Sequence, residues 1–379
     1  MKKITILQVV PSLYSGGVER GTVEISEAIV KAGMNSIVVS SGGTMASKIT
    51  DHGGMHITLN VASKNPFVIR SNIKKILAII ENYNVSLVHA RSRAPAWSCY
   101  KACKIKNIPF VTTFHGTYGH NFIKKHYNKV MTYGDRVIAV SNYIKEYISK
   151  HFPKALERTL VIHRGVDTHH FDPYAVPEQR IVNAKVNLNI NDIGDKSVIL
   201  LPARVTRWKG HLLFIEALKQ LDKSKYRAVI LGDSKGHSNY LSELKDVVEK
   251  AGLEGNVTFV EHLFDMSAIY MVSDIVVIPS LKPEAFGRVA IEAQSMAKIV
   301  LASNIGGAIE TIIDEETGFL FESGSSDDLA LRLHEIMTMD SKHRQRLGIK
   351  AREHIIENFT LAKMQADTIK VYKELLNIV

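Results

Sequence analysis

Short apolar runs alternate with amphipathic stretches along almost the whole of this sequence. In the first half the apolar runs predict buried strands, at Ile4–Val10, Ser36–Ser40, His56–Leu59, Ser86–Ala90, Phe110–Phe114, Arg136–Val140 and Thr159–Ile162. Between them lie stretches such as Val68–Ile80, whose apolar residues recur at helical spacing. Strands that alternate with helices in this way predict a parallel sheet with helices on both faces.

The rhythm breaks once, in VIHRGVDTHHFDPYAVPEQR, where one glycine and two prolines interrupt a polar stretch. A second series of strands then follows, at Ser197–Leu201, Ala228–Gly232, Val257–Val260, Ile275–Pro279 and Ile299–Ala302. A chain of 379 residues is also too long for one ordinary core. We therefore expect an α/β fold of two Rossmann-like doubly wound domains, 1–170 and 171–359, which face a central cleft. Open sheets bind ligands at the carboxyl ends of their strands, so the cleft is the expected site.

Composition places the chain among soluble globular proteins, with 45% hydrophobic and 23% charged residues. The start, MKKITILQVV, has too short an apolar run for a signal peptide and is interpreted as the first strand. No apolar stretch reaches the ~18 residues that span a bilayer, so we expect a cytoplasmic protein. Cys99 and Cys103 lie one helical turn apart and are interpreted as two buried thiols on one helix face, with a redox pair as the alternative.

The net charge is +10, from 48 Lys and Arg against 38 Asp and Glu. Such a surplus fits a nucleic-acid, membrane or anionic-substrate partner, or simply a solvated surface. We expect it to be spread along the chain, with modest local density in FIKKHYNK (122–129). Because no tract reaches the density of a nucleic-acid-binding arm, we expect no nucleic-acid partner and, instead, peripheral contact with the anionic inner face of a membrane.

The stretch SLKPEAFGRVAIEAQSM (280–296) places two carboxylates on either side of a glycine turn. It predicts a loop followed by a helix, so that the amides of Phe286, Gly287 and Arg288 lie at a helix N-terminus, which favours anionic or strongly accepting ligands. Glu284 and Glu292 would then reach different parts of one elongated ligand, since a carboxylate can accept from two hydroxyls of a sugar or ribose. Two surface glutamates beside an ordinary turn are the alternative.

Cations occur where the phosphates of such a ligand would need them. In LLPARVTRWKGH, Arg204 and Lys209 project from one loop between a strand and a helix. Arginine offers fork geometry and lysine a compact charge, so the two could clamp a diphosphate. Solvated loop charge is the alternative interpretation.

Three loops of the first domain could also meet a ligand. Gly17, in PSLYSGGVERGTVE, could bring backbone close to a phosphate or sugar, or serve only a tight turn. His115, in TTFHGTYG (112–119), could donate to a sugar hydroxyl or a developing phosphate charge, although a lone histidine is more often structural. Arg91 and Arg93, in HARSRAP, could meet an anionic acceptor.

Two motifs of other enzyme classes do not occur in the sequence. It contains no Asp-x-Asp pair for Mg²⁺ and no Gly-x4-Gly-Lys-Ser/Thr loop. We therefore expect no metal and no cofactor, with phosphate charge met by arginine, lysine and helix amides.

These motifs together resemble those of the retaining glycosyltransferases with the GT-B fold, specifically glycosyltransferase family 4. The resemblance runs over nearly the whole length, through SGGVER, TTFHG, VIAVSNYI, VIHRGVDTHHFDP, PARVTRWKG, VILGDS, PSLKPEAFGRVAIEAQSM, SNIGGAIETI and DEETGFLF. It implies a retaining hexosyltransferase that moves a sugar from a nucleoside-diphosphate sugar to an acceptor hydroxyl. The basic surface leads us to expect a lipid-linked or cell-surface glycan as that acceptor. A nucleotide-sugar 2-epimerase and a non-catalytic nucleotide-sugar binding module are the alternatives.

The resemblance also implies roles for particular residues. Diphosphate contacts fall to Arg204 and Lys209, the transferred sugar to Glu284, the ribose to Glu292 and the reacting sugar to His115. Other donor contacts fall to Gly17, Gly232, Phe286, Gly287 and Arg288, and weaker roles to Ser141 and Gly307. It further implies that the C-terminal helix, within 360–379, returns to the first domain. The sequence departs from the commoner pattern at HRGVD, where asparagine often precedes Gly-Val-Asp, and at Gly232-Asp233-Ser234, where Gly-Asp-Gly is more frequent.

Overall fold

The chain folds into two compact units, each described here by itself. The computed structural model describes residues 3–14, 16–118, 122–261 and 263–378. Unit 1 comprises Met1–Arg164 and Leu361–Val379, and unit 2 comprises Gly165–Thr360. Ser15 and Gly119, which belong to two of the predicted ligand loops, lie outside the described residues.

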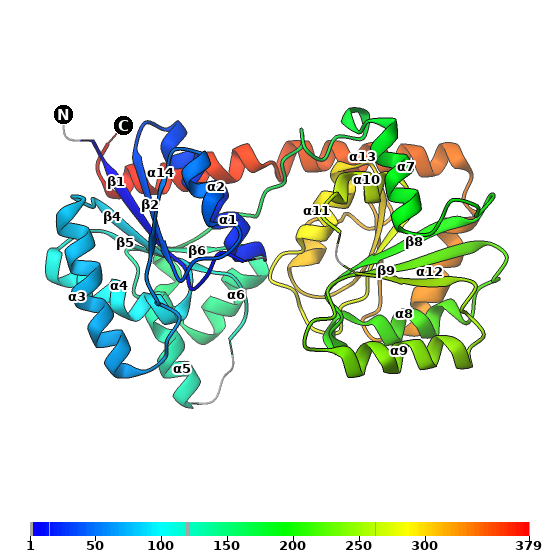
Figure 1. The fold of residues 1–379 in the computed structure, drawn as a ribbon, viewed down its shortest axis with the longest axis horizontal. Coiled ribbons are helices and arrows are strands. Elements are labelled where there is room, and N and C mark those ends of the chain that lie inside the picture. The colour runs from blue at the N-terminus through cyan, green and yellow to red at the C-terminus, as the bar shows by residue number, and fades with distance from the viewer. Residues whose placement is uncertain (1–2, 15, 119–121, 262, 379) are drawn as a thin grey trace. The chain divides into compact units, whose positions relative to one another are not determined.

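Unit 1 is a seven-stranded parallel sheet in the order β3-β2-β1-β4-β5-β6-β7. Its strands are β1 Thr5–Val9, β2 Asn35–Ser40, β3 Met55–Thr58, β4 Leu87–Ala90, β5 Phe110–Phe114, β6 Arg136–Ala139 and β7 Thr159–Val161. Its helices are α1 Gly17–Lys31, α2 Ala46–Asp51, α3 Pro66–Asn82, α4 Arg93–Lys106, α5 Phe122–Asn128, η1 Lys129–Thr132, α6 Asn142–His151, η2 Pro153–Arg158 and α14 Leu361–Leu375 (Figure 1).

Unit 2 repeats the design with six parallel strands in the order β10-β9-β8-β11-β12-β13. The strands are β8 Ser197–Pro202, β9 Tyr226–Leu231, β10 Val257–Val260, β11 Ile275–Ile278, β12 Ile299–Ser303 and β13 Phe319–Phe321. The helices are η3 Pro173–Ala175, α7 Glu178–Asn187, η4 Arg207–Lys209, α8 His211–Leu218, α9 Ser238–Lys250, α10 Met266–Met271, α11 Arg288–Ser295, η5 Gly307–Glu310, α12 Ser326–Thr338 and α13 Ser341–Asn358.

The predicted fold class of two Rossmann-like α/β domains is confirmed. Each of the twelve predicted strands occurs, with ends that differ from the prediction by at most two residues. The thirteenth strand, β13, was not predicted, because its three residues follow a turn and carry too little pattern to stand out. Both cysteines are buried as expected, and burial raises the pKa of each thiol.

The first boundary between the units lies after Arg164, six residues before the expected one at 170. The reason is a backbone contact within unit 2. Val166 pairs with Thr360 in a parallel bridge, and its amide donates to the carbonyl of Phe359 at 2.9 Å. This bridge ties the segment after Gly165 to the end of α13, so 165–170 belong to unit 2.

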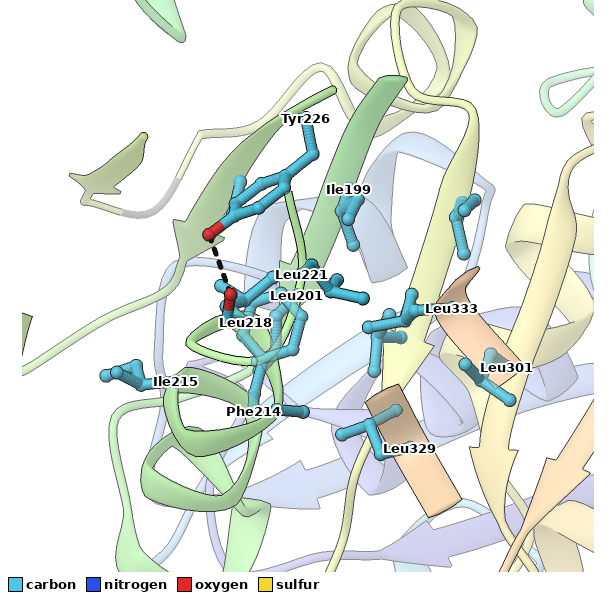
Figure 2. Packing of buried hydrophobic residues seen from close by; sticks show 14 of the residues in the cluster. Ile199, Leu201, Phe214, Ile215, Leu218, Leu221, Tyr226, Leu301, Leu329 and Leu333 are labelled. Carbon is cyan, nitrogen blue, oxygen red and sulfur yellow. Dashed lines mark hydrogen bonds between the residues drawn. The ribbon is translucent and has the colours of Figure 1, made fainter. Parts of the chain in front are cut away.

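The core of unit 2 lies between its sheet and helices α8 and α12. Figure 2 shows Phe214 and Leu218 of α8 and Leu329 and Leu333 of α12 beside strand residues of the sheet. The Tyr226 hydroxyl donates to the Leu218 carbonyl at 2.9 Å, which satisfies a polar group inside this apolar cluster.

The core of unit 1 includes the last helix of the chain. Met364, Val371 and Tyr372 of α14 join strand residues and residues of α1 in one buried cluster. The return of α14 to unit 1 follows from this apolar face (Figure 1). Within the described part of the chain, no helix is both long and apolar enough to cross a membrane.

Candidate active site

In unit 2, the predicted phosphate cations and sugar-binding glutamate lie on loops that follow two neighbouring strands. Strand β8 is paired with β9 on one side and β11 on the other, so the strand order reverses here. Such a switch point separates the loops at the carboxyl edge and leaves room for a ligand. The loop after β8 carries Arg204 and Lys209, and the loop after β11 carries Glu284.

Three contacts join these two loops. Lys209 Nζ donates to Glu284 Oε1 at 2.7 Å, and the Leu281 amide donates to the Trp208 carbonyl, also at 2.7 Å. The third is a close approach at Gly210, whose φ is +76° and where a Cβ would lie 1.7 Å from the carbonyl oxygen of Pro279. Only glycine fits both the backbone angle and the space, so the position of Lys209 is fixed by backbone as well as by charge.

Glu284 is held from three directions. Its Oε1 accepts from Lys209 and from the Ser280 hydroxyl, at 2.6 Å. Its backbone carbonyl accepts from the Gly307 amide at 2.8 Å. The side chains of Lys209 and Glu284 are 14% and 17% exposed, so the pair is mostly withdrawn from water yet still open to a ligand. No described residue donates to Oε2, which leaves that oxygen available to hydroxyl groups.

The paired glycines of SNIGGAIETI support this loop. A Cβ at Gly307 would lie 2.4 Å from the Ala285 carbonyl oxygen, and one at Gly306 would lie 2.7 Å from backbone atoms of Glu284. Their motif is therefore explained by close packing of one backbone against another, which keeps Glu284 in place.

Helix α11 begins directly after this loop. Gly287 precedes it with φ of +105°, and Phe286 is buried against Phe359, with ring centroids 5.8 Å apart. Glu292, one turn into the helix, is 7% exposed, and its Oε2 accepts from the Tyr270 hydroxyl at 3.3 Å. Arg288 lies 3.9 Å from the other carboxylate oxygen. A buried carboxylate beside a helix N-terminus is suited to binding hydroxyl groups.

Gly232, which follows β9, lies beside Arg204, which follows the neighbouring strand β8. A Cβ at Gly232 would lie 2.0 Å from the Ala203 carbonyl oxygen, so glycine lets the loop after β9 approach Arg204 closely. The Arg204 side chain is exposed, and the ion pairs identified among the described residues do not include it. His211 lies beneath the loop after β8. It is fully buried, and burial lowers its pKa to about 4.

Unit 1 has its own switch point at β1, which lies between β2 and β4. Arg91 follows β4 but points inward: it is 2% exposed, and its guanidinium donates to Gln8 at 3.1 Å. A Cβ on Gly21 of α1 would lie 2.6 Å from Arg164 and 3.1 Å from Arg91, so the helix rests on both guanidiniums. The expectation that Arg91 contacts an acceptor does not fit this burial.

His115 lies at the end of β5, beside this pair of arginines. Arg164 donates to His115 Nδ1. Burial and the nearby Arg164 and Arg91 charges hold the pKa of His115 well below its usual value. The ring is therefore neutral, with its proton on Nε2. This buried nitrogen has no hydrogen-bond partner among the described residues, so it presents a free N–H donor.

Three other predicted residues of unit 1 have clear local contacts. Arg93 donates to Asn128 at 3.0 Å, and its guanidinium lies 4.2 Å from the centre of the Tyr118 ring. Gly17 is the exposed first residue of α1. Ser141 caps α6 by accepting from the Ile144 amide at 3.1 Å, which gives it a structural role.

Two families of known proteins match this chain. "Glycosyl transferases group 1" matches residues 185–354 and "Glycosyltransferase Family 4" matches residues 15–170. A solved glycosyltransferase from Rickettsia africae ESF-5 is 39% identical, covers 99% of both chains and superposes with a TM-score of 0.93. This chain belongs to the GT-B glycosyltransferases.

Two further comparisons place this glycosyltransferase among its relatives. The lipopolysaccharide 1,2-N-acetylglucosaminetransferase of Salmonella typhimurium is 28% identical over 233 residues, which are 59% of this chain and 58% of that one. Anabaena HepE, solved with UDP and glucose, is 21% identical, covers 98% of this chain and 100% of its own, and has a TM-score of 0.84. At that identity the likeness to HepE shows the fold.

Sequence reasoning missed several residues that build the glycosyltransferase site. Trp208, Ser280 and Tyr270 contact predicted site residues, yet each occurs in a stretch whose pattern suggests only a loop or a helix. Arg164 was noted only as a departure from the commoner asparagine. In the described ranges, no three His, Cys, Asp or Glu side chains gather as a metal site would require.

Proposed function

We propose that this glycosyltransferase transfers a hexosyl group, with retention of anomeric configuration, from a nucleoside-diphosphate sugar to a hydroxyl of a lipid-linked or cell-surface glycan. One observation carries the proposal: Lys209 and Ser280 both bind Glu284 Oε1 at the switch point of unit 2. This preset arrangement places a cation for phosphate beside a carboxylate for sugar hydroxyls. The relatives named above are in keeping with a nucleotide-sugar donor and a glycan acceptor.

In the proposed reaction, unit 2 binds the donor. Arg204 and Lys209 bind the diphosphate, together with the amides at the N-terminus of α11, and Glu292 binds the ribose diol. As the bond between the anomeric carbon and the β-phosphate oxygen breaks, negative charge grows on that oxygen, where these cations stabilise it. The acceptor oxygen forms the new bond, and its proton passes to the leaving phosphate.

Unit 1 supplies the remaining proposed contacts. His115 offers the Nε2–H donor to a hydroxyl of the transferred sugar, and Gly17 brings the start of α1 close to the phosphates. Arg93 remains the proposed contact for an anionic acceptor, whereas Arg91 acts from beneath, by supporting α1. In unit 2, Gly232 is proposed to keep the loop that flanks Arg204 close to the donor.

A thermal-shift screen with UDP-, GDP- and ADP-sugars tests donor binding. A donor at 100 times its Kd should stabilise the protein by about 2.7 kcal/mol, because only the folded state binds it. The matching donor should then yield a glycosylated product with a lipid-linked glycan. The absence of a thermal shift with every one of these nucleotide sugars would contradict the proposal.

We also expect turnover to survive excess EDTA. The diphosphate charge in this proposal is met by Arg204, Lys209 and helix amides, so no divalent ion is needed. Initial rates with and without EDTA should agree within twofold, and a complete loss restored by Mg²⁺ would contradict the metal-free clamp.

A further inference from the structure

The basic surplus of this chain is concentrated in one helix layer of unit 1. Helices α3, α4, α5 and η1 together carry ten Lys and Arg and one acidic residue, Glu81. Helices α1, α2 and α14 carry six basic and six acidic residues. The expectation of a surplus spread along the chain is therefore wrong.

The two groups of helices cover opposite faces of the sheet (Figure 1). Val111 of β5 faces the cluster that contains α1 and α14, whereas its neighbour Thr112 donates to the Met131 carbonyl of η1. Successive strand residues point to opposite faces, so η1 lies on the face away from α1 and α14. Contacts within the layer join α3 to α4 through Ser98 and Ile69, and α4 to α5 through Trp97 and Tyr127. We call the layer formed by α3, α4, α5 and η1 the basic layer.

Most cations of the basic layer point into solvent. Eight are exposed: Arg70, Lys74, Lys75, Lys101, Lys104, Lys124, Lys125 and Lys129. Lys106 of this layer forms an ion pair with Glu81. Two exposed apolar side chains accompany the cations, Phe67 at the start of α3 with 83% exposed and Ile105 near the end of α4 with 63% exposed.

We propose that the basic layer docks on an anionic lipid surface. Seven of its eight exposed cations are lysines, which act as compact charges on a diffuse anionic surface. Nucleic acid is recognised largely through arginine forks and stacked aromatic groups, whereas Arg70 is the one arginine among the eight exposed cations of this layer, and Phe67 is the one aromatic side chain among the two exposed apolar residues named above. Phe67 and Ile105 can enter the headgroup region, where exposed apolar side chains are favoured. The inference does not depend on the proposed reaction.

Vesicle co-sedimentation without any substrate tests the proposal. The wild-type chain should bind vesicles of phosphatidylcholine with phosphatidylglycerol and dissociate from them at high salt. It should not bind vesicles of pure phosphatidylcholine. The variant Lys74→Glu with Lys75→Glu should lower the partition coefficient by about tenfold or more. The matched control, Lys48→Glu with Lys370→Glu, changes net charge equally on the opposite layer and should keep binding within about threefold.

Three results would overturn the proposal. Equal losses in both double variants would show that net charge alone matters, and equal binding to both vesicle types would remove the electrostatic basis. Tight RNA binding without vesicle binding would assign the layer to a different partner. Unchanged circular dichroism and unchanged donor-induced thermal shifts would show that the variants fold, so failure here is distinct from failure of the proposed reaction.

An independent observation concerns Arg164, and this inference rests on the proposed role of His115. We infer that Arg164 is a positioning residue that fixes the tautomer of His115. A guanidinium can only donate, so its contact with Nδ1 forces the His115 proton onto Nε2, the nitrogen left free for a ligand. The other titratable groups that face this ring are Arg91 and His89, neither of which contacts His115 Nδ1.

The test separates tautomer control from mere support of the fold. In Arg164→Ala, the loss of the donor and its charge should let His115 protonate at higher pH, so the acid limb of the kcat/KM profile should move upward, while Arg164→Lys should restore it. Nitrogen NMR of the ring reports the tautomer without any turnover. An unmoved limb and an unchanged ring spectrum in a folded Arg164→Ala protein would overturn the inference.

Discussion

The contact between Lys209 and Glu284 joins residues 75 positions apart in the sequence. Each was predicted as a site residue, but their direct ion pair was not, because spacing along the chain carries no information about distances between loops. The pair costs desolvation, since both side chains are largely withdrawn from water. We therefore expect the pair to serve the positions of these two charges rather than the stability of unit 2.

Replacing either member of this pair should strongly reduce turnover. Lys209→Ala and Glu284→Ala should each lower kcat by at least about 100-fold, the scale of losing one preorganised contact to developing charge. The double variant should lose less than the product of the single losses, because the residues act as a unit. Steady-state kinetics with the matched donor measures all three.

Exposed residues of the same unit provide the control for these variants. Lys250→Ala and Glu254→Ala remove the same charges from exposed positions and should keep near-normal rates. Rates near wild type in Lys209→Ala or Glu284→Ala would place the chemistry elsewhere.

At the scale of elements, strands and most helices follow directly from the sequence, whereas the reasons for particular glycines do not. Apolar runs are local signals, and so Val257–Val260 was predicted to the residue. The close approaches at Gly210, Gly232 and Gly307 are long-range contacts between loops and strands. No local pattern distinguishes a glycine that meets a ligand from one that meets another backbone.

The junction of η4 and α8 gives a stability prediction. Gly210→Ala adds a Cβ at 1.7 Å from the Pro279 oxygen, at a φ of +76°, and should destabilise unit 2 by about 3 kcal/mol or more. Gly236 has φ of +78° with no atom within 4 Å of its Cβ position, so Gly236→Ala should cost only about 1 kcal/mol. Urea unfolding measures the free energy of unfolding of both variants. Equal losses would mean that the backbone angle, and not the clash with Pro279, sets the cost of the substitution.

At the scale of the whole molecule, both units keep histidine rings neutral: His89 and His115 in unit 1, and His211 in unit 2. Burial holds the pKa of His89 and His115 well below the usual value and lowers that of His211 to about 4. The ring of His89 is bound on both sides, by Tyr372 of α14 at 2.6 Å and by Thr113 at 2.7 Å. These partners lie far from His89 in sequence, so this network could not be predicted either.

Neutral buried histidines should make the protein sensitive to acid. Above about pH 6.5, His211 is neutral in both the folded and the unfolded state, so its full contribution to the free energy of unfolding is present. As the pH falls from there towards 4, unfolded His211 takes up a proton that the folded ring refuses, which lowers the free energy of unfolding by about 3 kcal/mol. Urea unfolding at pH 7.5 and 5 should show the loss.

Two leucine substitutions separate this effect from general acid sensitivity. His211→Leu should flatten the pH dependence of unit 2, whereas His334→Leu, at an exposed position, should leave it unchanged. An unaltered slope in His211→Leu would show that other groups cause the acid sensitivity.

The return of α14 to unit 1 has a consequence for biosynthesis. A ribosome emits residues 3–164 first, but Tyr372, which completes the hydrogen bonding of His89, emerges only after all of unit 2 has been made. Unit 2 is continuous in sequence and can close its core earlier. Unit 1, most of which is synthesised before unit 2, is therefore the unit that finishes folding last.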